Sequence, residues 1–270
     1  MTTAPRPPEG DWLGTPFLEF QRHGPFAHLV VNRPAAKNAL TPAMYYGVRL
    51  AVRRMENDDS LAGMIITGTG DVFVPGGDLS ASGEDSWMDF SALMMDATPF
   101  DTLRQAAKPV VVAANGLTQG GGFMISLCSD VAVAVEGATF RVPELLRGIA
   151  DTYFSHMLLA TVGPVRTRDL MFTGRVLTAQ EALDWGLIGR VVAPSDLMST
   201  ATEVLTQVCR TAPQARNAVK LTVDRHIGLF DRGAMLASMR GPETAEGFRA
   251  FKARETPSWV AAELSTGERL

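Results

Sequence analysis

The sequence predicts an α/β fold with a helical C-terminal region, and three observations support this prediction. Short apolar runs rich in β-branched residues recur along the first half of the chain, among them Leu61 to Thr67, Pro109 to Ala114 and Val131 to Val135. Glycine-rich turns and helical stretches separate these runs at roughly regular intervals along the sequence, which favours parallel strands joined by helices. From Phe154 onward the spacing of apolar residues is mostly helical.

The first 105 residues predict a hairpin, two helices, a strand and a loop. The hairpin strands are Phe17 to Gln21 and Ala27 to Asn32, joined by a turn around Gly24. Pro42 to Asn57 has near-helical apolar spacing, and Thr41 before it is a suitable N-cap. The remaining predictions here are a strand over Leu61 to Thr67, a loop over Ser80 to Trp87, and a helix over Phe90 to Gln105 interrupted at Pro99.

The rest of the chain predicts two further strands and then mainly helices. The strands are Pro109 to Ala114 and Val131 to Val135, with a helix over Gly122 to Cys128 between them. The later helices are predicted at Val165 to Phe172, Ala179 to Trp185, Asp196 to Thr211, Gln214 to Phe230 and Gly233 to Arg254. We therefore expect a mobile N-terminal arm over residues 1–14, an α/β core over 15–200 and a helical region over 201–270.

Composition narrows the class of protein. The chain has 270 residues, of which 46% are hydrophobic and 20% charged, as in ordinary globular proteins. A formal net charge of −4 argues against a nucleic-acid partner. The Pro-rich start lacks the apolar core of a secretion signal, and no apolar run approaches the ~20 residues of a membrane helix. The only cysteines, Cys128 and Cys209, have no metal-binding spacing, so we expect a cytoplasmic protein without a metal site.

Two glycine-rich turns are the most informative feature of the sequence. They are Phe73-Val-Pro-Gly-Gly-Asp78 and Asn115-Gly-Leu-Thr-Gln-Gly-Gly-Gly-Phe123, and each follows a short apolar run. Turns of this kind leave backbone N–H groups available, and two of them can point at one oxygen to stabilise an enolate or oxyanion. A single carboxylate downstream, Glu144, is a candidate for proton transfer to that anion. This combination predicts an enzyme.

Several ordered segments resemble the enoyl-CoA hydratase/isomerase family of the crotonase superfamily. The resemblance runs from about Phe17 to about Val260. The matching segments are Asn32-Arg-Pro-Ala-Ala-Lys-Asn-Ala-Leu40, Thr67-Gly-Thr-Gly70, Phe73-x-x-Gly-Gly-Asp-Leu79, Asn115-Gly-x-x-x-Gly-Gly-Gly122, Phe140-x-x-Pro-Glu144, Leu170-x-x-Thr-Gly174, Ala179-x-Glu-Ala182, Trp185-Gly-Leu187 and Glu246-Gly-Phe-Arg-Ala-Phe251.

The resemblance implies a crotonase-like spiral of ββα units with a helical C-terminal trimerisation region. It implies acyl-CoA substrates, a homotrimer or hexamer, and an enolate held by the N–H groups of Gly77 and Gly121. Coenzyme A enters as part of the substrate, so no separate cofactor is expected. The residues implied to contact coenzyme A are Lys37, Ala39, Asp78, Leu79, Phe251 and Arg254, the last two often reaching a neighbouring subunit.

The sequence departs from the hydratase pattern at one catalytic position. Hydratases of this family use two glutamates, and this chain keeps the second as Glu144 but has Met124 at the first. A methionine can neither take nor give a proton. One glutamate suffices to move a proton between two carbons, as in the family's enoyl-CoA isomerases. Burial beside apolar neighbours such as Met124 would raise the pKa of Glu144 and suit it to this task.

The sequence is also compatible with other functions. Asp151 falls near the second carboxylate of dienoyl-CoA isomerases, so the chain could be a hydratase or an acyl-CoA hydrolase that uses Asp151. Tyr153 could add a polar tip to the substrate pocket beside Met124. The segment Gly148 to Ser155 lacks the family's later glycines, which leaves a catalytically impaired acyl-CoA-binding protein as a third reading.

Overall fold

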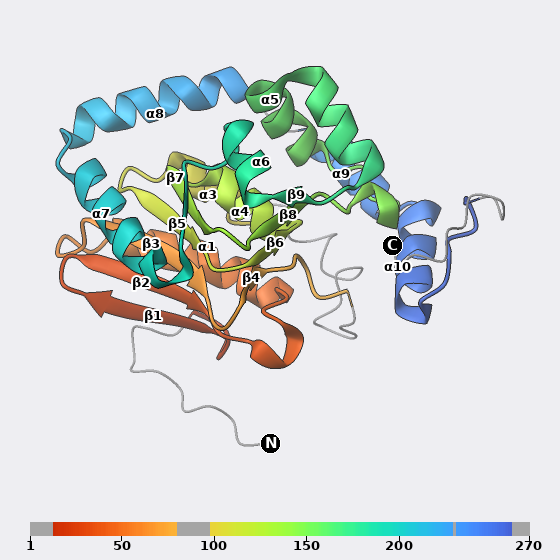
Figure 1. The fold of residues 1–270 in the computed structure, drawn as a ribbon, viewed down its shortest axis with the longest axis horizontal. Coiled ribbons are helices and arrows are strands. Elements are labelled where there is room, and N and C mark those ends of the chain that lie inside the picture. Colours follow the sequence, from red (N-terminus) through yellow and green to blue (C-terminus); the bar gives the residue numbers. More distant parts are fainter. Residues whose placement is uncertain (1–12, 80–97, 229–230, 261–270) are drawn as a thin grey trace.

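The computed structural model describes residues 13–79, 98–228 and 231–260 as two β-sheets surrounded by helices (Figure 1). The α/β fold expected from the sequence is confirmed. Most of the N-terminal arm, the loop over Ser80 to Trp87 and the first part of the helix over Phe90 to Gln105 lie outside the described residues.

The larger sheet has six strands in the order β1-β2-β3-β5-β7-β10. The first two strands form the expected antiparallel hairpin, and the other neighbours pair in parallel. All five residues of β5 are buried, as expected of a β-branched run covered on both faces. The strands are β1 (Leu18–His23), β2 (Phe26–Val31), β3 (Gly63–Gly68), β5 (Val110–Ala114), β7 (Val131–Val135) and β10 (Arg190–Val192).

The smaller sheet was not predicted, because its strands have only two or three residues. It has the order β4-β6-β8-β9, comprising β4 (Val72–Val74), β6 (Leu117–Gln119), β8 (Thr139–Arg141) and β9 (Leu177–Thr178). The pairs β4–β6 and β6–β8 are parallel, so the carboxyl ends of these three strands lie at one edge. The first glycine turn, the second glycine turn and Glu144 follow β4, β6 and β8 respectively. The small sheet therefore brings the three candidate site segments together.

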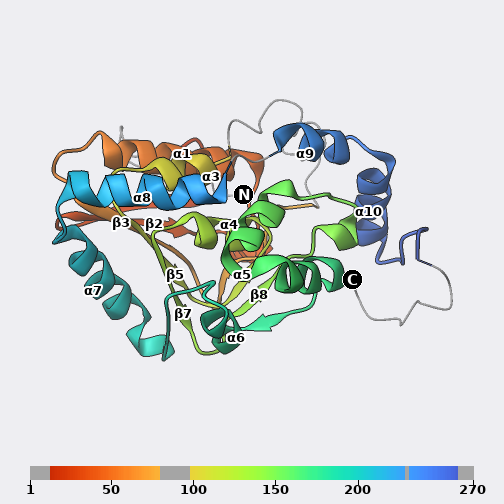
Figure 2. The ribbon, with the colours of Figure 1, turned by 90° about the horizontal axis from the view of Figure 1, so that it is seen from above.

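Helices cover both faces of the larger sheet, with α1 on one side and α7 on the other (Figure 2). The N-cap at Thr41 is confirmed, because its side chain accepts a hydrogen bond from Met44 N at 3.3 Å. The helices are α1 (Pro42–Glu56), α3 (Phe100–Gln105), α4 (Gly121–Cys128), α5 (Thr152–Thr173), α6 (Ala179–Asp184), α7 (Leu197–Cys209), α8 (Pro213–Ile227), α9 (Arg232–Met239) and α10 (Pro242–Ala253), with short 3₁₀ turns η1 (Pro34–Ala36), η4 (Leu145–Arg147) and η5 (Pro194–Asp196).

The single helix expected over Gly233 to Arg254 was wrong. The chain forms two helices, α9 and α10, with Gly241 as the N-cap of α10 and Pro242 at its first position. A proline at this position cannot donate to the preceding turn, so the first helix ends before it. The break lets α10 turn back and pack against η4, next to Glu144.

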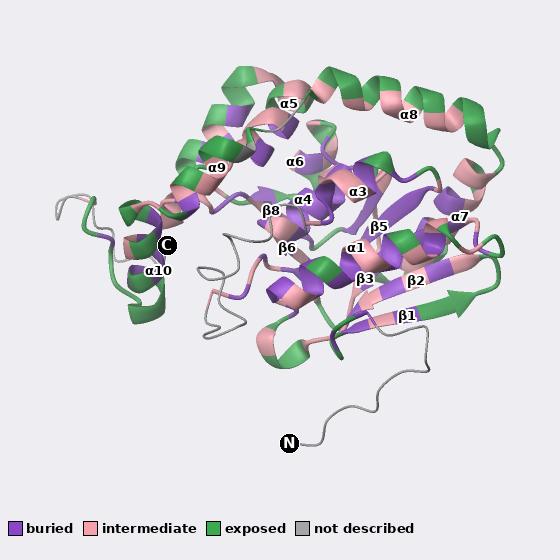
Figure 3. Ribbon diagram, turned by 180° about the vertical axis from the view of Figure 1, so that it is seen from behind, coloured by how far each residue is buried: buried purple, intermediate pink, exposed green. Residues whose placement is uncertain are grey.

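Burial follows the layers of the fold (Figure 3). One large cluster of buried side chains joins the strands of the larger sheet to α1, α4, α5 and α7. By contrast, α8 has no buried residue, and two of its valines, Val219 and Val223, are exposed. In the described part of the chain, no helix combines the length and apolar character needed to cross a bilayer.

Candidate active site

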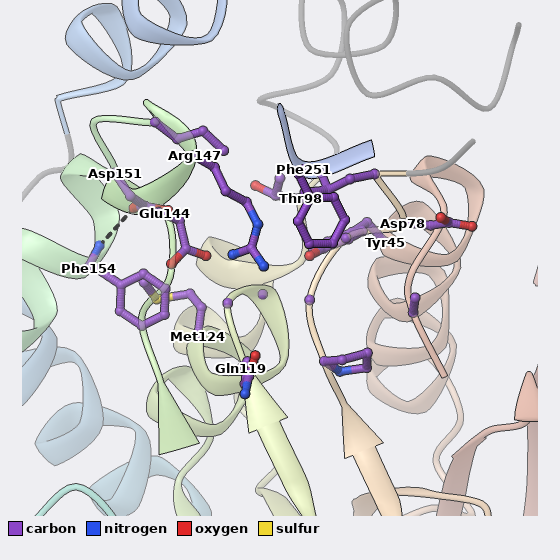
Figure 4. Close-up of a pocket in the computed structure, with 18 of the residues that line it drawn as sticks. Tyr45, Asp78, Thr98, Gln119, Met124, Glu144, Arg147, Asp151, Phe154 and Phe251 are labelled. Atoms are coloured by element: carbon purple, nitrogen blue, oxygen red, sulfur yellow. Dashed lines mark hydrogen bonds between the residues drawn. The ribbon is translucent and has the colours of Figure 1, made fainter. Parts of the chain in front are cut away.

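A cavity of about 730 Å³ lies where the parallel strands of the small sheet end. Its walls come from both glycine turns, the start of α5 and the helices α9 and α10. Figure 4 shows Glu144 and Asp151 on one side of the cavity and Tyr45 and Asp78 on the other. The lining includes most of the residues singled out from the sequence, namely Lys37, Ala39, Gly77, Asp78, Leu79, Gly121, Met124, Glu144, Asp151, Tyr153 and Phe251.

The two glycine turns meet in this wall. A Cβ added to Gly120 would stand 3.4 Å from the Cα of Gly76, and one added to Gly76 would stand 3.9 Å from the nitrogen of Gly121. Among the described residues, neither the Gly77 nor the Gly121 N–H donates a hydrogen bond. Gly121 is the first residue of α4, where a free N–H and the positive end of the helix dipole favour an anion.

A largely buried ion pair holds the first glycine turn in place. An Nη atom of Arg33 donates to the Asp78 carboxylate at 2.8 Å and to the Ala39 carbonyl at 2.9 Å. The backbone of the turn pairs with Leu40, which donates to Gly76 O and accepts from Asp78 N. The Asp78 N–H is therefore occupied, and the Asp78 side chain is anchored by Arg33. These contacts of Gly76 and Asp78, the neighbours of Gly77 in the chain, fix the orientation of the Gly77 amide.

Glu144 lies directly after the small sheet with its carboxyl group against the second glycine turn. A Cβ at Gly120 would stand 2.7 Å from Glu144 Oε1, and Oε2 is buried without a hydrogen-bond partner in the described parts of the chain. Burial, followed by the nearby Asp151 carboxylate, raises the pKa of Glu144 to about 8, against the opposing effect of Arg147. A carboxyl group in this state can both give and take a proton near neutral pH.

Asp151 is the N-cap of α5 and also faces the cavity. Its Oδ1 accepts a hydrogen bond from Phe154 N at 2.9 Å, shown as a dashed line in Figure 4. Burial raises its pKa to about 6, although hydrogen bonds from the Phe154 and Tyr153 backbone act in the opposite direction. Asp151 thus combines a structural role with a position beside Glu144.

The predicted pocket residues Met124 and Tyr153 are both buried and line the cavity. Met124 contributes an apolar thioether to the cavity wall. The Tyr153 ring packs edge-on against Phe100, at 5.7 Å between ring centroids.

The residues expected to contact coenzyme A divide into two groups. Lys37 and Ala39 follow η1, Asp78 and Leu79 follow the first glycine turn, and all four line the cavity with Phe251 of α10. Arg254 is the exposed C-cap of α10 and does not line the cavity. Phe251 thus reaches the cavity of its own chain.

Sequence reasoning missed two polar residues in the cavity, Tyr45 and Arg147. The Tyr45 hydroxyl fills the space where a side chain at Gly121 would begin. Burial raises the pKa of the Tyr45 phenol, and the nearby Glu144 and Asp151 carboxylates raise it further. Arg147 extends from η4 into the cavity (Figure 4). No sequence pattern marks either residue, because both reach the cavity only through the packing of α1 and η4.

Comparisons with known proteins identify the family of the chain. The family model for enoyl-CoA hydratase/isomerase matches residues 23–259. The chain is 31% identical over 255 residues to a carnitinyl-CoA dehydratase of Salmonella arizonae, covering 90% of this chain and 97% of that protein.

Solved structures show the same fold. An enoyl-CoA hydratase/isomerase from Pseudoalteromonas atlantica superposes with a TM-score of 0.74 at 28% identity, covering 90% of this chain and 100% of that one. A carnitinyl-CoA dehydratase from Mycobacterium avium gives a TM-score of 0.73 at 28% identity, with coverage of 92% and 100%. The chain belongs to the enoyl-CoA hydratase/isomerase family of the crotonase superfamily and is an acyl-CoA enzyme.

Proposed function

We propose that this enzyme moves a proton at the α-carbon of an acyl-CoA thioester and so shifts the position of a carbon–carbon double bond. The observation that carries the proposal is the position of the Glu144 carboxyl group, which lies next to the turn that contains Gly121. Among the described residues, its Oε2 has no hydrogen-bond partner. Met124 stands at the sequence position where the family's hydratases carry their other glutamate, which favours isomerisation over hydration.

In this mechanism the thioester carbonyl oxygen accepts hydrogen bonds from the Gly77 and Gly121 N–H groups. Ionised Glu144 takes a proton from the α-carbon of a 3-enoyl thioester, and the electron pair delocalises onto the carbonyl oxygen. The same carboxyl group then returns its proton to the γ-carbon, which leaves the 2-enoyl product. Each oxyanion donor is worth roughly 10²–10³ in rate, because it binds the enolate more strongly than the ground-state carbonyl.

The direct test offers the enzyme a 3-enoyl-CoA and follows formation of the 2-enoyl product. Glu144→Gln keeps the shape of the side chain but cannot accept the proton, so the reaction should fall by ~10²–10⁴. Glu136→Gln is the matched control, because Glu136 is an exposed carboxylate after β7. Full activity in the Glu144 variant would show that another group is the base.

A second candidate function is the hydration of 2-enoyl-CoA or the dehydration of 3-hydroxyacyl-CoA. It is favoured by the position of Asp151 in the same cavity as Glu144 and by relatives named carnitinyl-CoA dehydratase. Asp151 would activate water in hydration or help to release it in dehydration, while Glu144 would transfer the α-proton. An acyl-CoA hydrolase could use the same water molecule.

Asp151→Asn separates the two candidates. Asparagine is as good an N-cap as aspartate, so the start of α5 is preserved while the acid is removed. Loss of crotonyl-CoA hydration in this variant, with double-bond isomerisation retained, would favour the lyase reaction. Retention of both activities would leave Asp151 with only its capping role.

We also propose that the enzyme works as a homotrimer or hexamer. The support is a set of exposed apolar side chains on two helices at the edge of the fold, namely Val165 and Phe172 of α5 and Val219 and Val223 of α8. Large exposed apolar residues gathered on one face commonly mark an interface. Sedimentation equilibrium should give three or six times the chain mass of 29.0 kDa.

A further inference from the structure

Arg147 occupies a position in the cavity that the proposed proton transfer does not use. Its side chain leaves η4 and extends into the cavity between Glu144 and Phe251 (Figure 4). The centre of its guanidinium group lies 4.8 Å from the centroid of the Phe251 ring. The backbone there is held in place, because Arg147 N donates to Glu144 O at 2.9 Å and the Arg147 carbonyl abuts Gly247 of α10.

No carboxylate in the described parts of the chain forms an ion pair with Arg147, although the nearby Glu144 carboxylate favours its charged form. None of the described residues forms a hydrogen bond or ion pair with its guanidinium, and its Nε is buried and unsatisfied. A guanidinium stays protonated in proteins, and a buried charge without a partner is costly. A ligand with an anionic group would supply the hydrogen-bond acceptor that this guanidinium lacks.

The proposed function places the acyl portion of the substrate near this charge. Arg147 is three residues from the proposed proton shuttle Glu144 and packs on the same side of the cavity. Lys37, which follows η1 and also lines the cavity, is the cation expected from the family resemblance to contact coenzyme A. An arginine at the reactive end of the cavity is suited to a group carried by the acyl chain.

We propose that Arg147 binds a carboxylate at the far end of the acyl group, so that the preferred substrates are CoA thioesters of dicarboxylic acids. A planar guanidinium can hold a carboxylate through two parallel hydrogen bonds, with the Phe251 ring supporting its face. The same charge repels an acyl group with a quaternary ammonium, such as a carnitinyl group. This inference relies on the proposed function only for the placement of an acyl-CoA in the cavity.

Equilibrium binding to the native enzyme tests the inference without relying on turnover. The probes are three saturated thioesters of matched length: glutaryl-CoA with a terminal carboxylate, valeryl-CoA with a methyl group, and 4-(trimethylammonio)butyryl-CoA with a cation. Glutaryl-CoA should bind at least tenfold more tightly than valeryl-CoA, and the cationic thioester more weakly than both. Equal affinities for glutaryl-CoA and valeryl-CoA would overturn the proposal.

Variants assign the preference to Arg147. Arg147→Leu should abolish the advantage of glutaryl-CoA while changing valeryl-CoA affinity by less than about threefold, and Arg147→Lys should keep part of it because its charge remains. Arg166→Leu is the matched control, because Arg166 stacks on Trp185 at the same 4.8 Å but does not line the cavity. This control should retain the native preference.

Thioesters of pantetheine distinguish a carboxylate from a coenzyme phosphate, because pantetheine carries no phosphate. If Arg147→Leu weakens all three CoA thioesters equally and leaves pantetheine thioesters unchanged, Arg147 binds a phosphate and the proposal is wrong. Absence of double-bond isomerisation would refute the proposed reaction but would leave a measured preference for glutaryl-CoA intact, so the two failures are distinguishable.

Discussion

The carboxyl group of Glu144 rests against the backbone of Gly120, where a Cβ would stand 2.7 Å from Glu144 Oε1. Gly120 has a φ of 49° and a ψ of −127°, a backbone conformation that residues with a Cβ rarely adopt. Glycine is therefore required here both for the shape of the turn and for the space that the acid occupies. The turn that presents the Gly121 amide also sets the position of the proposed proton shuttle.

Gly120→Ala should reduce turnover without abolishing folding. The added methyl group would displace the Glu144 carboxyl group, and a misplacement of about 1 Å can lower a rate on the order of 10²-fold. Strain at the positive φ should also lower the free energy of unfolding by ~1–2 kcal/mol. Both quantities are measured by steady-state kinetics and chemical denaturation.

Gly137→Ala provides the control for this change. Gly137 lies in the turn after β7, outside the positive-φ glycines, and a Cβ there meets no atom within 4 Å. The control should retain native kcat. An unchanged kcat in Gly120→Ala as well would show that the position of Glu144 does not depend on the turn.

Replacing Glu144 with glutamine should stabilise the protein increasingly as the pH rises from about 5 to 8. The pKa of Glu144 is raised from 4.5 to about 8, so in this window the folded state holds a proton that the unfolded state has lost. The native enzyme therefore loses stability with rising pH, whereas a neutral glutamine does not. By pH 8 the difference in unfolding free energy should reach ~1–4 kcal/mol.

Denaturation curves of the two proteins at pH 5 and pH 8 measure this difference. Asp151 is present in both proteins, so the difference reports Glu144 together with its electrostatic interaction with Asp151. A stability difference that stays constant over this range would mean that the Glu144 carboxyl group titrates normally and is exposed to water.

Removal of Arg33 should weaken both stability and activity through the first glycine turn. Arg33→Met removes the guanidinium that donates to Asp78, whose side chain is only 7% exposed. Losing a hydrogen bond between charged groups costs about 1.5–3 kcal/mol, and the Gly77 amide loses part of its support. The expected readouts are a lower unfolding free energy and a lower kcat/KM.

Arg22→Met is the corresponding control, because the Arg22–Asp58 pair is short, at 2.6 Å, but its side chains are 45% and 24% exposed. An exposed pair contributes only ~0–1 kcal/mol. Equal effects of the two substitutions would contradict a special role for Arg33 in the turn.

The elements that the sequence predicted are those with a strong local signal. The buried run of β5 and the capped helix α1 each carry their periodicity within one segment. The small sheet escaped prediction because three residues give no alternation to detect, and its pairing depends on long-range contacts. The break between α9 and α10 was visible as Gly241-Pro242, a signal that the helical spacing around it obscured.

The residues of the candidate site likewise differ in whether the sequence carries a signal for them. Motif positions such as Gly121 and Glu144 were identified because the family resemblance fixes them in the sequence, and the structure places both at one cavity. Tyr45 and Arg147 were missed because an aromatic residue in an amphipathic helix and an arginine after Leu146 look ordinary. Only the packing of α1 and α10 around the cavity gives them significance.

Exchange of the α-protons of butyryl-CoA into deuterated water tests most directly whether Glu144 transfers a proton to and from an enolate held by Gly77 and Gly121. Proton NMR should show the native enzyme exchanging these protons, and Glu144→Gln doing so at least ~10²-fold more slowly. Exchange at the native rate in the variant, or none with the native enzyme despite bound thioester, would contradict the account.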